Sequence, residues 1–442
     1  MDEPLAQAGP PLERAPAGVA APAVPAGLQR QPPRWRGWLR AVIVDSKPLR
    51  HRDFRLLYLA QAVSFAGSMI TYVAIPFQVF HLTRSPLAVG LLGLAEFVPL
   101  LLTALVGGAL ADARDRRRLV WATEAGLALA SAGLAVNALL PHPNLGVLYA
   151  AAAAMAGLEG LQRPSLEALV PRLVTREEMP AAAALRSLRG NVGMLAGPAL
   201  GGLLIATAGL PTAYLVDVAT FAVSLLALRL IRAVPPPPDA RRPSLRSVAD
   251  GLRYAWSRPE LLGTYVVDIV AMVFGMPMAL LPAIAAGLGG AGTLGLLYAA
   301  PSAGALLVSA ASGWTARVHR HGLAIALAAA VWGLAIAGFG LVGSLWPALV
   351  LLAVAGGADM VSGMFRTTMW NQTVPDTLRG RLASIELLSY STGPSLGNVE
   401  AGAVAGAFGV RASVVSGGVL CVVGVAAVTL ALPAFRAYDA RR

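Results

Sequence analysis

Twelve long apolar runs constrain the fold of this 442-residue chain more than any other feature. A helix needs about 20 apolar residues to cross about 30 Å of hydrocarbon, and each run reaches that length. Backbone groups cannot stay unpaired in lipid, so runs of this length must be helical. The sequence therefore predicts an all-α membrane protein with twelve transmembrane helices. The predicted spans are residues 55–80, 86–111, 119–140, 145–168, 180–206, 211–232, 260–284, 291–314, 322–342, 345–371, 381–408 and 411–434.

The composition excludes a soluble protein and several kinds of chemistry. Charged residues make up 13% of the chain, against about 25% in soluble domains. The net charge of +12 lies in short connectors and not on an amphipathic face, so we expect no nucleic-acid partner. The lone Cys421 and five histidines confined to connectors offer no metal site. No Gly-x-x-x-x-Gly-Lys-Ser/Thr loop is present, so we expect no ATP-driven pump, no enzyme, no metal and no cofactor.

Positive charge orients the predicted helices. Of the 35 lysines and arginines, only Arg84 and Arg411 fall in the connectors on one side of the membrane. The other 33 lie in the N-terminal tail, in connectors on the opposite side, or on helix ends near that side. Because cytoplasmic loops are enriched in Lys and Arg, that side is predicted to be cytoplasmic, and both termini lie there. We expect a multi-pass protein of the cytoplasmic membrane.

Two proline-bearing stretches divide the chain. Residues 1–50 are predicted to form a disordered cytoplasmic tail, in which Arg34–Arg40 either lies at the lipid interface or simply continues the tail. Residues 233–259 contain the run Pro235–Pro238 and are predicted to be an extended, semi-rigid cytoplasmic linker. The remaining predicted parts are a six-helix bundle at 51–232, a second six-helix bundle at 260–434, and a cytoplasmic tail at 435–442.

Two short patterns recur at equivalent places in these halves. Val170–Arg176 and Val374–Arg381 each begin with Val-Pro, interpreted as a helix stop, and continue into a short charged turn. The Gly-x-x-x-Asp-x-x-x-Arg pattern of Gly108–Arg116 closes the second span, and the degenerate copy Gly313–His321 closes the eighth. Matched patterns at matched positions indicate a duplicated 6+6 arrangement, which is common in secondary transporters.

The stretch Gly108–Arg117 resembles the signature of the major facilitator superfamily, Gly-x-x-x-Asp-Arg-x-Gly-Arg-Arg, between the second and third helices. Ala113 and Asp115 depart from that pattern. Phe54–Leu119 and Val170–Leu185 are similar to one branch, the enterobactin (catecholate siderophore) exporters. The resemblance implies the major facilitator fold and a monomer that exports a small-molecule substrate in exchange for protons, with two bundles rocking around a central site.

The charged segment 107–118, at the end of the second span, is predicted to act as a conformational latch. Gly107 and Gly108 lack side chains, so another helix can approach them closely. Asp112 would face the positive N-terminus of the eleventh span. Arg116 would pair with Glu159 or Glu167 on the fourth span and hold the outward-facing state. The alternative is a positively charged stop-transfer loop. The latch residues are Gly108, Asp112, Arg116, Arg117, Glu159, Arg163 and Glu167.

Ionisable side chains inside the spans require a reason, since each costs at least about 2.5–3.5 kcal/mol there. Carboxyl groups at such positions either carry the coupled proton or make structural hydrogen bonds between helices. Asp217 is assigned to the structural group. The predicted proton-coupling residues are Glu96, Asp268, Asp359 and Glu386.

Arginines within the helices are candidates for substrate binding. Arg186 and Arg189 lie three residues apart on one face of the fifth span, where guanidinium groups would suit an anionic, catechol-type ligand. The alternative is that they pair with Glu177 and Glu178. The predicted cavity residues are Arg186, Arg189, Asn191, Arg366, Tyr72, Trp370 and Tyr390.

The sequence thus predicts a secondary transporter that exports a small molecule, with a siderophore as the first candidate substrate. A broad-specificity drug or macrolide efflux pump of the same superfamily is the alternative. A non-transporting membrane protein is a third possibility, but such a protein does not need two matched halves.

Overall fold

The computed structural model describes residues 45–232, 258–374 and 376–441, without the side chains of 105–106, 108–109, 111–113 and 376–391. The predicted interfacial segment Arg34–Arg40 and most of the predicted linker lie outside the described residues. The described residues are helical and contain no strand.

The first half contains five helices after a short 3-10 turn. They are η1 (Lys47–Arg50), α2 (Arg52–Thr83), α3 (Pro86–Ala113), α4 (Arg116–Leu139), α5 (Leu145–Leu173) and α6 (Met179–Arg229). At 51 residues, α6 would be about 75 Å long as one straight helix, more than twice the thickness of the hydrocarbon core. It is broken at Gly209, whose φ of 82° lies in the left-handed region. The helix therefore covers both the fifth and the sixth predicted span.

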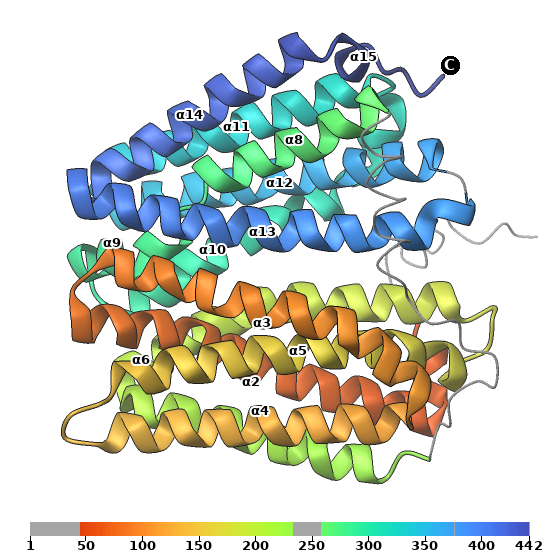
Figure 1. Cartoon of the computed structure of the whole chain (residues 1–442), viewed down its shortest axis with the longest axis vertical. Helices are drawn as coiled ribbons and strands as arrows, with labels where there is room; N and C mark the ends of the chain where they lie inside the picture. Colours follow the sequence, from red (N-terminus) through yellow and green to blue (C-terminus); the bar gives the residue numbers. More distant parts are fainter. Residues whose placement is uncertain (1–44, 233–257, 375, 442) are drawn as a thin grey trace, which may run out of the picture. The chain divides into compact units, whose positions relative to one another are not determined.

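The second half repeats this order with more interruptions (Figure 1). Its elements are α8 (Pro259–Phe274), η2 (Met278–Leu280), α9 (Leu281–Leu288), α10 (Ala291–Ala310), η3 (Ser312–Arg317), α11 (His321–Leu341), α12 (Leu345–Thr373), α13 (Asp376–Phe408), α14 (Val410–Ala431) and α15 (Pro433–Arg436). Ten helical segments of the described residues are long and apolar enough to cross a membrane. The all-α membrane architecture is confirmed, and each of the twelve predicted spans lies on helix, although the count of twelve crossings stays a prediction.

The seventh predicted span is not one helix. It stops after Phe274 and resumes at Met278 as a 3-10 turn. Pro277 has no N–H to donate and disfavours helix at the residue before it, which explains the break. The freed backbone groups find side-chain partners. Trp332 Nε1 donates to Gly275 O at 3.1 Å, and Ala279 N donates to Asn398 Oδ1 at 3.2 Å.

One of the two predicted Val-Pro helix stops is wrong. α5 continues through Pro171 and ends at Leu173, so the first Val-Pro pair lies inside the helix. In the second half, α12 ends at Thr373 and Val374 caps it, as predicted. A proline removes one hydrogen bond but does not end a helix whose packing continues. α5 already contains Pro164, which shows the same tolerance.

Glycines bring equivalent helices together in both halves. A Cβ placed on Gly107 of α3 would lie 3.0 Å from Gly160 O and from Leu161 Cα of α5, which confirms the predicted close approach. α10 and α12 make the corresponding pair, where a Cβ on Gly356 would collide with the backbone of Pro301.

The two halves touch through a backbone seam formed by α3 with α13 and by α6 with α10. α3 and α13 run side by side in Figure 1. A Cβ on Gly402 of α13 would lie 2.8 Å from Pro86 O at the start of α3, and a Cβ on Gly202 of α6 would lie 2.6 Å from Ala291 O at the start of α10. Second helix meets fifth helix in both contacts, which is the relation expected for a duplicated fold.

Candidate functional site

A cavity of about 510 Å³ lies within the first half. Residues of α2, α4, α5 and α6 form its wall. They include aromatic and aliphatic side chains together with a polar group from each of the four helices. The polar lining residues are Tyr58, Gln61, Ser64, Ser68, Glu124, Glu159, Gln162, Arg163, Glu167, Arg186 and Arg189.

Glu124 is the most deeply buried charged group in this wall, with 1% of its surface exposed. Its Oε1 accepts hydrogen bonds from Gln61 Nε2 at 2.7 Å, from Ser64 Oγ at 3.3 Å and from Gln162 Nε2 at 3.3 Å. Its Oε2 is buried, and the hydroxyl of Ser224 lies near the carboxyl without the geometry of a hydrogen bond to it. A buried carboxylate oxygen without a donor is costly, so this atom is suited to receive a proton or a ligand donor.

Glu124 was not among the site residues predicted from the sequence. The residue follows the arginines at the start of α4 by two turns, so its charge was attributed to the helix end. The signal was nevertheless present, because Glu124 is the first carboxylate inside an otherwise apolar run that begins at Leu119. Its partners come from two other helices and cannot be read from one sequence.

Arg186 and Arg189 lie on α6 and line the same cavity. The guanidinium of Arg189 lies 5.8 Å from the centre of the Phe65 ring, and its Nε is buried without a hydrogen-bond partner among the described residues. Arg189 and Glu124 thus both line the cavity, and each has a buried polar atom without a partner among the described residues. Asn191 does not contribute to the lining of this cavity.

Three residues predicted for coupling or binding come together in the second half. Arg366 of α12 forms an ion pair with Asp268 of α8, and its Nη2 lies 3.7 Å from Asp359 Oδ1. Asp268 is buried, with 8% of its surface exposed. The cavity beside this cluster is only about 10 Å³, and Ala329 contributes to its wall. This second polar centre is filled by its own charges.

The two centres occupy equivalent positions in the repeat. Gln61 and Asp268 each lie nine residues after the first residue of α2 and α8. Glu124 and Ala329 each lie eight residues after the first residue of α4 and α11.

The fourth helix of each half completes this correspondence. Gln162 and Arg366 each lie eight residues before a Val-Pro pair. The glutamine, glutamate and glutamine of the first half thus become aspartate, alanine and arginine in the second.

The predicted latch lies partly inside the described residues. Arg116 is the buried first residue of α4, and its Nη1 donates to Ala168 O of α5 at 3.3 Å, beside the predicted partner Glu167. Glu159 lines the cavity instead. Arg163 Nε lies 3.6 Å from Glu167 Oε1 on the same helix.

Asp115 replaces the usual glycine of the superfamily signature and caps α4. Its carboxylate accepts from Arg117 N at 2.9 Å and from Arg118 N at 3.3 Å. The side chains of Asp112, Glu386 and Tyr390 and the surroundings of Gly108 are not described by the structure.

The aromatic candidates lie apart from the cavity of the first half. Tyr72 stacks edge-on against Tyr298, with ring centres 5.4 Å apart. Trp370 Nε1 donates to Tyr265 Oη at 2.6 Å. Glu96 lies half-buried on α3 and does not line that cavity either.

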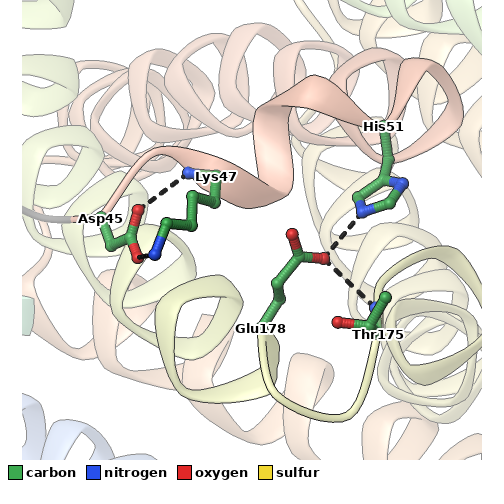
Figure 2. A network of polar contacts seen from close by, with 5 residues as sticks. All are labelled: Asp45, Lys47, His51, Thr175 and Glu178. Atoms are coloured by element: carbon green, nitrogen blue, oxygen red, sulfur yellow. Dashed lines mark hydrogen bonds and ion pairs between the residues drawn. The ribbon is translucent and has the colours of Figure 1, made fainter. Parts of the chain in front are cut away.

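The start of α2 is joined to the turn before α6, as Figure 2 shows. His51 Nε2 and Glu178 Oε2 lie 2.7 Å apart, and Thr175 N donates to the same oxygen at 3.3 Å. Partial burial acts to raise the pKa of Glu178, but the hydrogen bonds from His51 and Thr175 outweigh it and hold that pKa below its ordinary value of 4.5. Glu178 therefore bonds to His51 and not to Arg186 or Arg189, whereas the alternative pairing with Glu177 stays untested.

Comparison with solved structures identifies the fold. The nucleoside transporter NupG has a similar fold, with a TM-score of 0.70 at 11% identity over 85% of this chain and 99% of that chain. A bacterial homolog of the human lysosomal transporter Spinster gives a TM-score of 0.69 at 18% identity over 88% of this chain and 98% of that chain. The fold is that of a major facilitator transporter, as predicted.

The chain belongs to the transmembrane secretion effector family of this superfamily, whose profile matches residues 44–442. It is 32% identical over 352 residues to the enterobactin exporter EntS of Shigella boydii serotype 18 and to that of Escherichia coli O1:K1. Each alignment covers 78% of this chain and 84% of the relative. The protein is therefore a secondary transporter and not an enzyme.

Proposed function

We propose that this protein exports a siderophore across the cytoplasmic membrane, in exchange for protons, through the cavity of the first half. The observation that carries the proposal is the cavity of about 510 Å³ in which Arg189 and Glu124 both present buried, unsatisfied polar atoms. The identity of 32% to enterobactin exporters supplies the substrate class.

The wall of the cavity suits an aromatic anion. Arg186 and Arg189 offer guanidinium donors, which bind paired oxygens such as those of a catecholate. Phe54, Tyr58 and Phe65 supply ring faces and edges for stacking, which is worth about 0.5–1.5 kcal/mol for each aromatic pair.

Glu124 is our first candidate for the coupled proton. Its Oε1 is held by three donors, so the carboxyl stays in place while Oε2 gains or loses a proton. In a site of low dielectric, that change of charge alters the interaction with the arginines and with an anionic substrate.

The second centre offers a further route for protons. A proton on Asp268 or Asp359 would release Arg366 toward the other carboxylate. Glu96 and Glu386 stay candidates for the same role.

The remaining proposals concern topology and cycling. Both termini lie in the cytoplasm, the protein acts as a monomer, and the latch around Arg116 holds the outward-facing state. The bond from Arg116 to α5 supports this role, since it links the start of α4 to a neighbouring helix.

The full-length protein in liposomes, assayed for enterobactin uptake driven by a pH gradient, tests the proposal. We expect Arg189→Gln to weaken apparent enterobactin affinity about 10–100-fold, the worth of a hydrogen bond to a charged group. Glu124→Gln should lower gradient-driven uptake at least about 10-fold and make the residual uptake insensitive to the gradient.

The matched controls are Arg172→Gln and Glu177→Gln. Each makes the same substitution at an exposed residue outside the cavity. Equal losses in the controls, or full activity in both cavity variants, would overturn the assignment of the site. Uptake of macrolides without uptake of enterobactin would instead support the drug-efflux alternative.

A further inference from the structure

A second pocket lies where α4 begins and α6 ends, away from the transport cavity. Its volume is about 390 Å³, and its lining contains three arginines, a tryptophan and a leucine: Arg117, Arg118, Trp121, Leu228 and Arg229. α4 and α6 pack against each other along this side of the bundle. None of these residues lines the cavity assigned to the substrate.

Among the described residues, the lining of this pocket holds three arginines and no carboxylate. Arg117 is fixed in place, because its Nη1 donates to Ile231 O at 2.5 Å and to Arg229 O at 3.4 Å. The nearby Asp115 already accepts from two backbone N–H groups at the start of α4. Like charges held close together repel each other, so the arrangement calls for an anion.

Trp121 gives the pocket a second feature that indicates a ligand. Its Nε1 is buried and has no acceptor among the described residues, although an indole N–H in such a place usually has one. The guanidinium of Arg229 lies 5.2 Å from the centre of the indole ring. Arginine and tryptophan together at the end of membrane-spanning helices are typical of the headgroup level.

Exposed apolar side chains continue from the pocket along α6. Val223, Leu226 and Leu230 are 52%, 63% and 57% exposed. In a bilayer such side chains face acyl chains. A phospholipid could therefore place its phosphate in the pocket and its acyl chains along this surface.

We propose that this pocket binds the phosphate of an anionic phospholipid, with Arg118, Arg229 and the indole N–H of Trp121 as donors. Basic pockets between transmembrane helices bind acidic headgroups by the same chemistry. Arg117 positions the end of α6 beside the headgroup. The bound lipid thus connects the end of α6 to the start of α4. The buried Arg116 directly precedes Arg117 of this pocket.

Native mass spectrometry of the full-length protein in detergent tests this site. Phosphatidylglycerol, phosphatidylcholine and inorganic phosphate are titrated separately onto the wild type, onto an Arg118→Gln/Arg229→Gln variant and onto Trp121→Phe. We expect the wild type to bind phosphatidylglycerol more tightly than phosphatidylcholine. The double variant should lose about 30-fold in affinity for phosphatidylglycerol, at about 1 kcal/mol for each arginine. Trp121→Phe, which keeps every charge, should lose a smaller part of the preference.

The control is Arg172→Gln/Arg176→Gln, which removes two exposed charges from the end of α5 and the turn after it. This variant should keep the preference for phosphatidylglycerol. An equal loss in both double variants would show general charge attraction and refute the site. Displacement of phosphatidylglycerol by millimolar inorganic phosphate would show a small-anion site and refute the lipid assignment.

Discussion

The two halves of the transporter carry different side chains at the equivalent positions of their polar centres. In the first half, Glu124 is held by the amides of Gln61 and Gln162, which satisfy one oxygen and bring no opposite charge. In the second half, the equivalent positions hold Asp268 and Arg366, which pair with each other. The first centre opens into a cavity, and the second is almost filled by its own side chains.

The difference shows how a duplicated fold can divide its work. A buried carboxyl bonded only to neutral donors keeps its capacity to gain or lose a proton. In the second half, Arg366 lies between the carboxylates of Asp268 and Asp359, and removing one partner of such a buried ion pair is strongly destabilising. The halves share a helical framework. The side chains at three equivalent positions determine which half has a carboxyl beside an open cavity.

The largest expected effect comes from breaking the ion pair. Arg366→Gln leaves Asp268 buried without its cation and should lower the free energy of unfolding by about 3–5 kcal/mol. Adding Asp268→Asn should recover most of the loss, because it removes the stranded charge. Thermal unfolding of the purified protein measures both. If the double variant were as unstable as the single one, the pair would not be the reason.

A second change imports the arginine into the first half. Gln162→Arg would place a guanidinium beside Glu124, at the position that Arg366 has in the other half. The new ion pair should slow enterobactin uptake about 10-fold or more by occupying the open oxygen of Glu124, since such bonds are worth about 1.5–3 kcal/mol. Uptake by proteoliposomes is the measurement, and Gln162→Asn is the neutral control. Unchanged uptake would mean that an open Glu124 is not required.

The smallest effect concerns the N-caps of the first helices, which are again equivalent. His51 caps α2 and bonds to Glu178 before α6, whereas Arg258 caps α8 and pairs with Glu260, two residues away. Because the pKa of Glu178 is held below 4.5, its contact stabilises the fold above that pH and is lost as the pH falls through the lowered pKa. Glu178→Gln should lower Tm by about 1 °C near neutral pH.

The same substitution should have no effect in strong acid, where Glu178 is already protonated. Thermal scans between about pH 7 and pH 3 check the sign. A destabilisation that grew toward low pH would contradict it.

The sequence predicted the framework better than the chemistry. Long apolar runs were enough to predict the helices. The repeated patterns were enough to predict that the chain has two related halves. The assignment of Asp217 as a structural group was also confirmed, since its carboxylate accepts from Thr71 and Ser131 of two other helices at 2.6 Å each.

The centre at Glu124 could not be predicted in the same way. Which side chains meet depends on how each helix is rotated about its axis, and hydropathy does not specify rotation when most faces are apolar. The helix break after Phe274 was not predicted, but it could have been, because Gly275 and Pro277 are local sequence signals of a break. The close approach at Gly107 could be predicted because a glycine permits close helix contact whichever residues face it.

The seam of glycines between the halves has a consequence for how the transporter moves. In lipid, apolar surfaces gain little by leaving their surroundings, so a contact between backbones is held mainly by dispersion. Such attraction is short-ranged, and a gap of about 0.5–1 Å forfeits a quarter to a half of it. Contacts as tight as those at Gly202 and Gly402 therefore favour a joint that is either fully shut or released, with little energy to gain from intermediate openings.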